Sequence, residues 1–419
     1  MTTRQPPQGR RVPRVLYSFP YRIGAGRICL TAWQQVIGAT PQAEMTVLCG
    51  SVDRPLPGAV KVVKTLGMGR FHLPMRVVGR NRMLALHDWI TARWLEANAD
   101  GIDIVHCWPG AALRTIRTAR RFGIPTLLER PNAHTAYAFE AEDEESRRCG
   151  IQLEKGHDHS FNQRTLDHEM REYEESDFLL CPSDFVARSF LDRGFAAGKI
   201  LPHQYGFDEG RFTPGPAERS QREGLEVVYA GVCEPRKGLH YALAAWQASE
   251  AGRAGSFRIC GNFVPGYRQS LGPLLEHPRV HAMGQRDDLP MILRESDVLV
   301  LSSVEEGSAL VCYEATGSGC VLLVSDASGA KCRHGTDSLV HSMRAVDELA
   351  GHFSQLHRDR ALLATLRRGA LASRDGLTWK RAGQRLSSIY QQVLAAPSFP
   401  GPAHSLSHPA MAASRNSLP

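Results

Sequence analysis

Short apolar runs alternate with helix-length amphipathic segments along most of the chain. This alternation is typical of parallel sheets whose faces are covered by helices. In the first half, the apolar runs predict strands at 14–19, 45–50, 102–108, 125–129, 177–183 and 199–205. The amphipathic segments between them predict helices that include 26–37, 83–98, 111–121 and 184–193. The first half of the chain therefore predicts a doubly wound α/β domain.

A segment rich in Gly, Pro and charge, residues 206–224, interrupts the alternation and predicts a linker. The pattern then restarts and predicts strands at 225–231, 256–261, 279–284, 297–303 and 320–326, with helices near 238–249, 287–295 and 309–317. Two such domains place a cleft between them at the carboxyl ends of the strands. We expect a disordered basic N-terminus at 1–12, a first domain at 13–205, a second domain at 225–376, a C-terminal helix at 377–395 that can cross back to the first domain, and a disordered tail at 396–419.

Composition agrees with this division, because 419 residues are too many for one ordinary domain. No stretch approaches the roughly 20 apolar residues that cross a bilayer, and the start lacks the apolar segment of a secretory signal. The ten cysteines form no C-x-x-C pair, and several lie in strand-like runs, where cysteine behaves as a small hydrophobe in a reducing compartment. We therefore expect a cytoplasmic protein.

The net charge of +7 is distributed unevenly along the chain. Residues 61–83 hold no acid and carry Lys61, Lys64, Arg70, Arg76, Arg80 and Arg82. Apolar residues are interleaved with these cations, so the stretch can lie peripherally on the anionic inner face of a membrane. The alternative, a solvated face, is the commoner meaning of such a charge pattern. The acidic run at 139–148 predicts a solvated helix.

Two cations follow the first strand of the second half. That strand ends at Gly231, and Arg236 and Lys237 stand just before Gly238, where a helix is expected to begin. Cations beside the free N–H groups of a helix N-terminus make a strong receptor for a diphosphate. An ordinary pair of surface charges is the alternative.

Two glutamates, Glu306 and Glu314, lie eight positions apart in a largely apolar run, although glutamate is seldom buried. In one continuous helix they would be rotated by roughly 80° and would not share a face. We expect Glu306 in a loop with Gly307, and Ser308 as the cap of a helix that carries Glu314 inward. Both carboxylates would then face the cleft, for acid and base catalysis or to accept hydrogen bonds from sugar hydroxyls.

The segments "YAGVCEPRKGL" and "DVLVLSSVEEGSALVCYEATGSG" together resemble the signature of glycosyltransferase family 4, retaining enzymes of the GT-B fold that use nucleotide-sugar donors. Further similar landmarks, among them "DIVHCW", "CPSDFVARSFLDRGF" and "GFDEGRFTP", follow in order between about residues 100 and 340. The resemblance implies two Rossmann-like domains that face each other across a cleft. It also implies transfer of a hexose, with retention, to a glycan, lipid-linked or small-molecule acceptor, as in the biosynthesis of cell-surface polysaccharide.

The resemblance also implies residue roles. Glu306 would meet the hydroxyls of the donor sugar, and Glu314 would meet the nucleotide ribose. The donor diphosphate would lie on Gly231, Arg236, Lys237 and Gly238. Phosphates and sugar would also meet the backbone amides of Ser308, Ala309, Leu310 and Val311.

On the first domain, the resemblance places a catalytic histidine at His134, facing the donor sugar across the cleft. A lone histidine is more often structural, but its position after a strand end favours function. His106 is a weaker candidate. Gly24 and Gly26 would form the acceptor-side loop, where the match is looser.

No metal and no other cofactor is expected, because the histidines near 156–168 fit no standard metal site. The expected partners are a nucleotide-sugar donor and a glycan or lipid-linked acceptor, with no nucleic acid. Among the departures from the family pattern, "EGSA" replaces the usual "EGFG", which bears on donor-sugar identity, and Tyr205 stands where Asn is frequent.

Three alternatives stay open. One is a nucleotide-sugar epimerase or phosphorylase on the same fold. The second is an NAD-linked dehydrogenase, since "GAG" follows the first strand, although the third glycine of the dinucleotide fingerprint is missing. The last is a non-catalytic sugar-binding subunit, because a fold does not by itself imply turnover.

Overall fold

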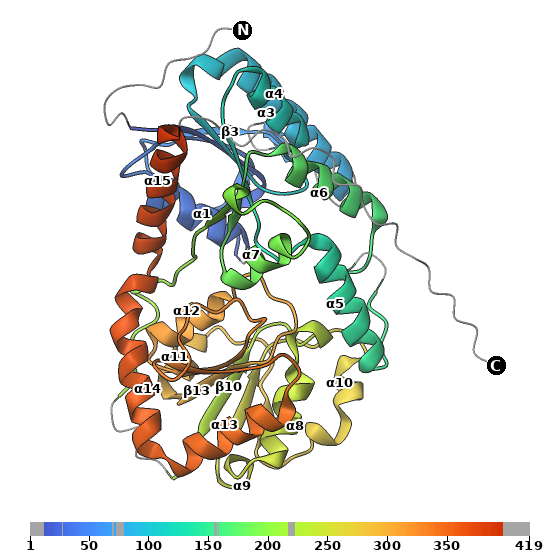
Figure 1. Cartoon of the computed structure of the whole chain (residues 1–419), viewed down its shortest axis with the longest axis vertical. Coiled ribbons are helices and arrows are strands. Elements are labelled where there is room, and N and C mark those ends of the chain that lie inside the picture. Colours follow the sequence, from blue (N-terminus) through green and yellow to red (C-terminus); the bar gives the residue numbers. More distant parts are fainter. Residues whose placement is uncertain are drawn as a thin grey trace, which may run out of the picture.

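The computed structural model describes residues 12–26, 28–68, 71–72, 79–154, 157, 159–216 and 223–396. These residues form two α/β domains, the blue-to-green one above the yellow-to-red one in Figure 1, and each is built on a parallel sheet covered by helices. The predicted pair of doubly wound domains is confirmed. Of the stretches expected to be disordered, residues 1–11 and 397–419 fall outside the described residues, as do residues 69–70 and 73–78 of the basic stretch at 61–83.

The first domain has a seven-stranded parallel sheet in the order β3-β2-β1-β6-β7-β8-β9. Its strands are β1 (Arg14–Ile23), β2 (Glu44–Val52), β3 (Lys61–Lys64), β6 (Ile104–Cys107), β7 (Thr126–Glu129), β8 (Phe178–Cys181) and β9 (Ile200–Pro202). Its helices are α1 (Ile28–Ala39), α3 (Arg80–Asn98), α4 (Leu113–Arg121), α5 (Thr135–Arg148), α6 (Gln163–Glu175) and α7 (Asp184–Leu191), and a short antiparallel pair joins β4 (Gly67–Met68) to β5 (Phe71–His72).

The second domain has a six-stranded parallel sheet in the order β12-β11-β10-β13-β14-β15. Its strands are β10 (Glu226–Ala230), β11 (Ser256–Cys260), β12 (Val280–Ala282), β13 (Val298–Leu301), β14 (Val321–Ser325) and β15 (Ser338–His341). The helices that follow the domain crossing are α8 (Leu239–Ala248), α9 (Ala251–Ala254), α10 (Tyr267–Leu271), α11 (Leu289–Glu295), α12 (Leu310–Gly317), α13 (Val346–Arg358), α14 (Arg360–Ser373) and α15 (Trp379–Ala395).

The strand orders fix where a ligand can lie. In each sheet the order reverses beside the first strand of the domain, between β1 and β6 and between β10 and β13. Side chains of these central strands are buried on both faces, which explains their continuous apolar runs. In open α/β sheets, ligands bind outside the carboxyl ends of the strands at this reversal. A ligand site is therefore expected at the loops that follow β1, β10 and β13.

The last helix, α15, returns to the first domain and lies beside α1 (Figure 1). Its apolar face joins the first-domain core through Leu386, Ile389 and Tyr390. Glycines allow the two helices to touch, because a Cβ on Gly383 would lie 2.3 Å from the carbonyl carbon of Gly38. The chain thus crosses between the domains twice.

The two crossings pair with each other. Phe207 forms a parallel bridge with Thr378, and its amide donates to the Leu377 carbonyl at 3.1 Å. Phe207 and Phe212 are buried in the second-domain core, so this part of the predicted linker at 206–224 is packed against the second domain. The two apolar side chains in this segment were a sign of burial in the sequence. The Gly- and Pro-rich composition of the segment obscured that sign.

No helix among the described residues is long and apolar enough to span a bilayer.

Candidate active site

The loop after β10, residues 231–238, will be called the Arg236 loop. Gly231 has a φ of 150°, and the loop closes with a short 3₁₀ turn over Pro235–Lys237. Gly238 has a φ of 65°, and a Cβ there would come within 1.9 Å of the Ser302 carbonyl oxygen. Glycine is required at position 238 for both reasons. The glycine lets the Arg236 loop pack against residues 302–309. These residues follow β13 and will be called the Glu306 loop.

The two loops meet as the strand order predicts. The Val304 amide donates to the Arg236 carbonyl at 2.8 Å. The Lys237 ammonium donates to the Glu306 carboxylate at 2.5 Å, and these side chains remain 15% and 13% exposed. Burial alone would raise the pKa of Glu306, but Lys237 and Arg236 bring it below its ordinary value. Glu306 is therefore ionised at neutral pH and paired with a cation of the site.

Arg236 is buried among carboxylates. Its guanidinium lies 2.7 Å from Glu234, 3.0 Å from Glu305 and 3.9 Å from Glu142. Burial acts to lower the pKa of Arg236, but Glu234 and Glu305 raise it above its ordinary value. A diphosphate would have to compete with these acids for the guanidinium. The assignment of Arg236 to the diphosphate stays a prediction, and Glu234 and Glu305 are neighbours that the sequence patterns did not single out.

Glu314 lies on α12, close to the charge of Arg211. Burial raises the pKa of Glu314 to about 7, and Arg211 opposes this shift. The α12 helix begins at Leu310 without a side-chain cap, so the prediction that Ser308 caps it is wrong. The Ser308 hydroxyl lies 3.0 Å from the Tyr313 hydroxyl instead. Ala309, Leu310 and Val311 form the start of the helix as expected.

His134 lies in the first domain, between β7 and α5. Its ring packs among Tyr173, Phe190 and Phe195 in the first domain, with centroids 5.1–5.9 Å away. Its Nδ1 accepts from the Ala136 amide at 3.2 Å and thereby caps α5. Cap and aromatic contacts thus fix the orientation of the ring, and the role of His134 toward the donor sugar stays a prediction.

His106 belongs to a second buried cluster of the first domain, centred on Glu129. This carboxylate lies 3.3 Å from His106 Nε2 and 2.9 Å from His203 Nε2. It also accepts from the Tyr205 hydroxyl and the Gln35 amide, each at 2.9 Å. Burial would raise the pKa of Glu129, but His203 and His106 hold it below its ordinary value. The cluster lies at the carboxyl ends of β6 and β7.

Gly24 and Gly26 lie in the turn between β1 and α1, with φ values of 89° and 100°. A Cβ on Gly24 would lie 2.8 Å from the Cβ of Arg54. The turn therefore needs glycine, and it lies at the carboxyl edge of the first sheet. Its acceptor-side role stays a prediction.

The Glu306 loop also touches the first domain. The Ser183 hydroxyl donates to the Gly307 carbonyl at 2.5 Å, and the Ala133 amide donates to Glu305 at 3.1 Å. A Cβ on Gly307 would lie 1.5 Å from the Pro131 carbonyl oxygen. The two domains are thus closed over the candidate site, and Gly307 permits that closure.

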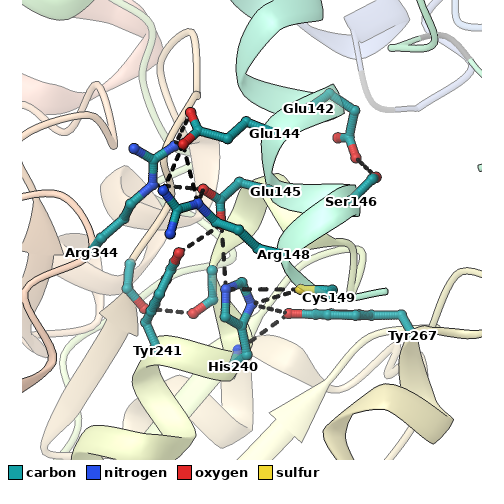
Figure 2. A network of polar contacts seen from close by, with 12 residues as sticks. Glu142, Glu144, Glu145, Ser146, Arg148, Cys149, His240, Tyr241, Tyr267 and Arg344 are labelled. Atoms are coloured by element: carbon teal, nitrogen blue, oxygen red, sulfur yellow. Dashed lines mark hydrogen bonds and ion pairs between the residues drawn. The ribbon is translucent and has the colours of Figure 1, made fainter. Parts of the chain in front are cut away.

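The acidic helix α5 forms a second contact between the domains, and the prediction that it is solvated is wrong. Glu145 accepts from Arg344 at 2.6 Å and from the Tyr241 hydroxyl at 2.8 Å, and it lies 3.4 Å from His240 (Figure 2). Glu144 pairs with Arg344 at 2.9 Å. The signal that could have found this contact is helical spacing, since the buried positions of α5 include 138, 142 and 145.

Among the described residues, no group of three or more His, Cys, Asp or Glu side chains is arranged to hold a metal ion. The expectation that no metal or cofactor is needed stays a prediction.

Comparison with known protein families gives a match in the second domain. Residues 224–359 match the family model described as "Glycosyl transferases group 1". This range is a group 1 glycosyltransferase domain. It contains the Arg236 loop, the Glu306 loop and Glu314, so the resemblance to group 1 glycosyltransferases is confirmed for the domain that carries these motifs.

Two curated relatives are similar over part of their length. A D-inositol 3-phosphate glycosyltransferase of Salinispora arenicola is 25% identical over 252 residues, which are 53% of this chain and 56% of the relative. A UDP-Gal:alpha-D-GlcNAc-diphosphoundecaprenol alpha-1,3-galactosyltransferase of Escherichia coli is 31% identical over 86 residues, 20% of this chain and 22% of that protein. The matches span little more than half of the first relative and under a quarter of the second.

Solved structures resemble nearly the whole chain. Sucrose-phosphate synthase from Thermosynechococcus elongatus has a TM-score of 0.67 at 17% identity, covering 92% of this chain and 100% of that one. Anabaena Alr3699/HepE in complex with UDP-glucose has a TM-score of 0.62 at 15% identity, covering 90% and 99%. WaaG, a glycosyltransferase involved in lipopolysaccharide biosynthesis, has a TM-score of 0.60 at 14% identity with the same coverage. At these identities the likeness establishes the GT-B fold.

Proposed function

We propose that the chain is a retaining glycosyltransferase that moves a hexose from a nucleotide-diphosphate sugar to a glycan, lipid-linked or small-molecule acceptor. The observation that carries this proposal is the contact of Lys237 with Glu306 at the strand-order reversal of the group 1 domain. A cation for a leaving diphosphate and an acceptor for sugar hydroxyls are adjacent there.

In this proposal the two sides of the pair separate when the donor binds. Phosphate oxygens replace the Glu306 carboxylate at Lys237, and a sugar hydroxyl replaces Lys237 at Glu306. Arg236 lies behind Lys237 and adds its charge to the stabilisation of the leaving diphosphate. Glu314 accepts hydrogen bonds from the ribose, and the amides at the start of α12 face the phosphates.

The donor and acceptor are proposed from the relatives. One structural neighbour holds UDP-glucose, and one curated relative is named for a UDP-galactose donor and a diphosphoundecaprenol-linked acceptor. UDP-hexoses are therefore the first donors to test, and a lipid-linked glycan the first acceptor. Synthesis of a cell-surface polysaccharide in the cytoplasm is the process that such an acceptor implies.

Peripheral binding at a membrane belongs to the same proposal. On α3, Trp89 is 49% exposed, and Arg82 and Arg93 are exposed on the same helix. These positions are separated by seven and four residues, so they share one face. An exposed tryptophan between arginines suits an anionic lipid surface. Flotation with phosphatidylglycerol vesicles, lost in Trp89→Ala with Arg82→Ala, supports this; equal flotation of both proteins contradicts it.

The activity itself is tested with radiolabelled sugar. Purified protein is incubated with UDP-glucose, UDP-galactose, GDP-mannose or ADP-glucose and a lipid-linked glycan, and label in the glycan is measured. Transfer from one donor supports the proposal. A donor that is converted to its epimer, without transfer to the glycan, identifies an epimerase instead. Binding of a donor without turnover identifies a sugar-binding subunit.

A further inference from the structure

The two departures from the family pattern, Ser308 and Tyr205, are joined through one side chain. The hydroxyl of Tyr313, on α12, lies 3.0 Å from the Ser308 hydroxyl. The backbone amide of Tyr205 donates to the same Tyr313 hydroxyl at 3.4 Å. All three residues are buried, with Tyr313 1% and Ser308 5% exposed. Tyr205 and Tyr313, which are 108 positions apart, thus meet at the residue that follows Gly307 in the Glu306 loop.

The Tyr205 amide fixes one hydrogen bond of the Tyr313 hydroxyl. An amide N–H can only donate, so one lone pair of the Tyr313 oxygen is engaged as an acceptor. Between the Tyr313 and Ser308 hydroxyls, which lie 3.0 Å apart, either oxygen can be the donor. In both directions the contact holds the Ser308 hydroxyl in place and leaves it its proton or a lone pair for a ligand.

The position of the Tyr205 amide is fixed from the first domain. The Tyr205 hydroxyl donates to Glu129 at 2.9 Å, and His203 lies 2.9 Å from the same carboxylate oxygen. A hydrogen bond to an ionised carboxylate is shorter and stronger than a neutral one. The Tyr205 ring also packs against Trp379 at the start of α15, with centroids 6.0 Å apart. Tyr205 is therefore held at both crossings of the chain between the domains.

We propose that Tyr313 is a positioning residue for donor-sugar selectivity, which holds the Ser308 hydroxyl in place for a hydrogen bond with the donor sugar. This inference rests on the proposed function, because it assigns a role within the same donor site. It extends that function to a residue, Tyr313, that neither the motif nor the comparisons single out. Ser308 touches the ligand, and Tyr313 acts through Ser308.

The test compares nucleotide-sugars with their free nucleotides. Calorimetry gives Kd for UDP-glucose, GDP-mannose and ADP-glucose, and for UDP, GDP and ADP, with the wild type and with Ser308→Ala, Tyr313→Phe and the double variant. The substitutions should weaken the binding of the nucleotide-sugar and not that of the free nucleotide. We expect each single variant to weaken the tightest nucleotide-sugar by about five- to tenfold, with the matching free nucleotide changed less than about twofold.

A double-mutant cycle separates this role from a general loss of stability. Because Tyr313 acts through Ser308, the double variant should bind the nucleotide-sugar no more weakly than Ser308→Ala alone. Tyr390→Phe is the matched control: it also removes one buried hydroxyl, which lies 2.8 Å from His106 Nδ1. It should lower Tm as much as Tyr313→Phe does and leave both Kd values unchanged.

Two different failures are distinguishable. If the wild type binds none of the nucleotide-sugars, the proposed function is overturned and this inference with it. If the wild type binds one of the nucleotide-sugars, either of two results overturns only the role of Tyr313. In the first, Tyr313→Phe binds that nucleotide-sugar as tightly as the wild type does. In the second, the affinity of Tyr313→Phe for the free nucleotide falls as much as its affinity for the nucleotide-sugar.

Discussion

Lys237 and Glu306 lie 69 residues apart in the chain, yet the Lys237 ammonium is 2.5 Å from the Glu306 carboxylate. Each comes from a loop at the carboxyl end of a central strand, on either side of the strand-order reversal. In this structure each group satisfies the charge of the other. A donor that carries both phosphate and sugar hydroxyls offers each of them a replacement partner.

Replacing Glu306 by glutamine should separate binding from turnover. The change removes the anion that competes for Lys237, so UDP should bind as tightly as to the wild type or several-fold more tightly. The kcat of sugar transfer should fall by about 10²–10³-fold, because the neutral glutamine amide interacts with the sugar more weakly than the glutamate carboxylate does. Glu295→Gln, at an exposed glutamate on α11, is the control and should change neither quantity. Weaker UDP binding in Glu306→Gln would mean that the carboxylate only orients Lys237.

Gly307→Ala should prevent domain closure. The added Cβ would lie 1.5 Å from the Pro131 carbonyl oxygen, so the loop and the first domain cannot keep their contact. We expect a larger radius of gyration in solution scattering and loss of transfer, with UDP still bound by the second domain. Gly351→Ala on α13 is the matched control, because its Cβ would meet no atom within 4 Å. An unchanged radius in Gly307→Ala contradicts this account of closure.

Arg344 should tie the domains together through α5. It has a φ of 68°, the one positive value of a residue other than glycine in the described part of the chain, and it pairs with Glu144 and Glu145. Arg344→Ala should destabilise the closed form by about 2 kcal/mol, because Glu145 is buried and loses a charged hydrogen bond. Thermal unfolding and solution scattering measure this.

Arg147→Ala, which removes an exposed ion pair on the same helix, should cost less than about 1 kcal/mol and leave the radius unchanged. Equal effects of Arg344→Ala and Arg147→Ala on the free energy of unfolding and on the radius of gyration would show that α5 does not specifically hold the two domains together.

Glu314 should give the protein two opposite pH dependences. Its folded-state pKa of about 7 lies above the ordinary 4.5, so the folded protein keeps a proton that the unfolded chain loses between these values. The contribution of Glu314 to the free energy of unfolding therefore falls as pH rises through this window. UDP affinity should instead rise as pH passes 7, because only the carboxylate accepts both ribose hydroxyls.

Calorimetry with UDP at pH 6 and pH 8 tests the second dependence. In Glu314→Gln both dependences should be absent. A wild type whose UDP affinity is the same at the two pH values would contradict a ribose contact by the ionised form.

The strands and the two loops of the donor side could be predicted because their cause is local and periodic. Apolar runs such as Val298–Leu301 form central strands whatever their neighbours, and parallel strands bring their carboxyl ends to one edge. The meeting of Lys237 with Glu306 follows from that geometry.

What escaped prediction depends on partners distant in the sequence. Ser308 has the residue type of a helix cap, but Tyr313, one turn later, provides a competing hydroxyl. His134 follows a strand end, but its ring is fixed by Phe190 and Tyr173 from later segments. Glu145 on α5 is neutralised by Arg344, 199 residues away, so charge along the sequence could not reveal its burial.

The most direct test of the donor site is calorimetry of UDP, GDP and ADP with the wild type and with a variant that carries both Arg236→Ala and Lys237→Ala. The account predicts that the wild type binds one of these nucleotides and that the variant binds it at least about 100-fold more weakly, because the diphosphate loses two charged hydrogen-bond donors. If the variant bound that nucleotide with unchanged affinity, the diphosphate would lie elsewhere and the assignment of the site would be wrong.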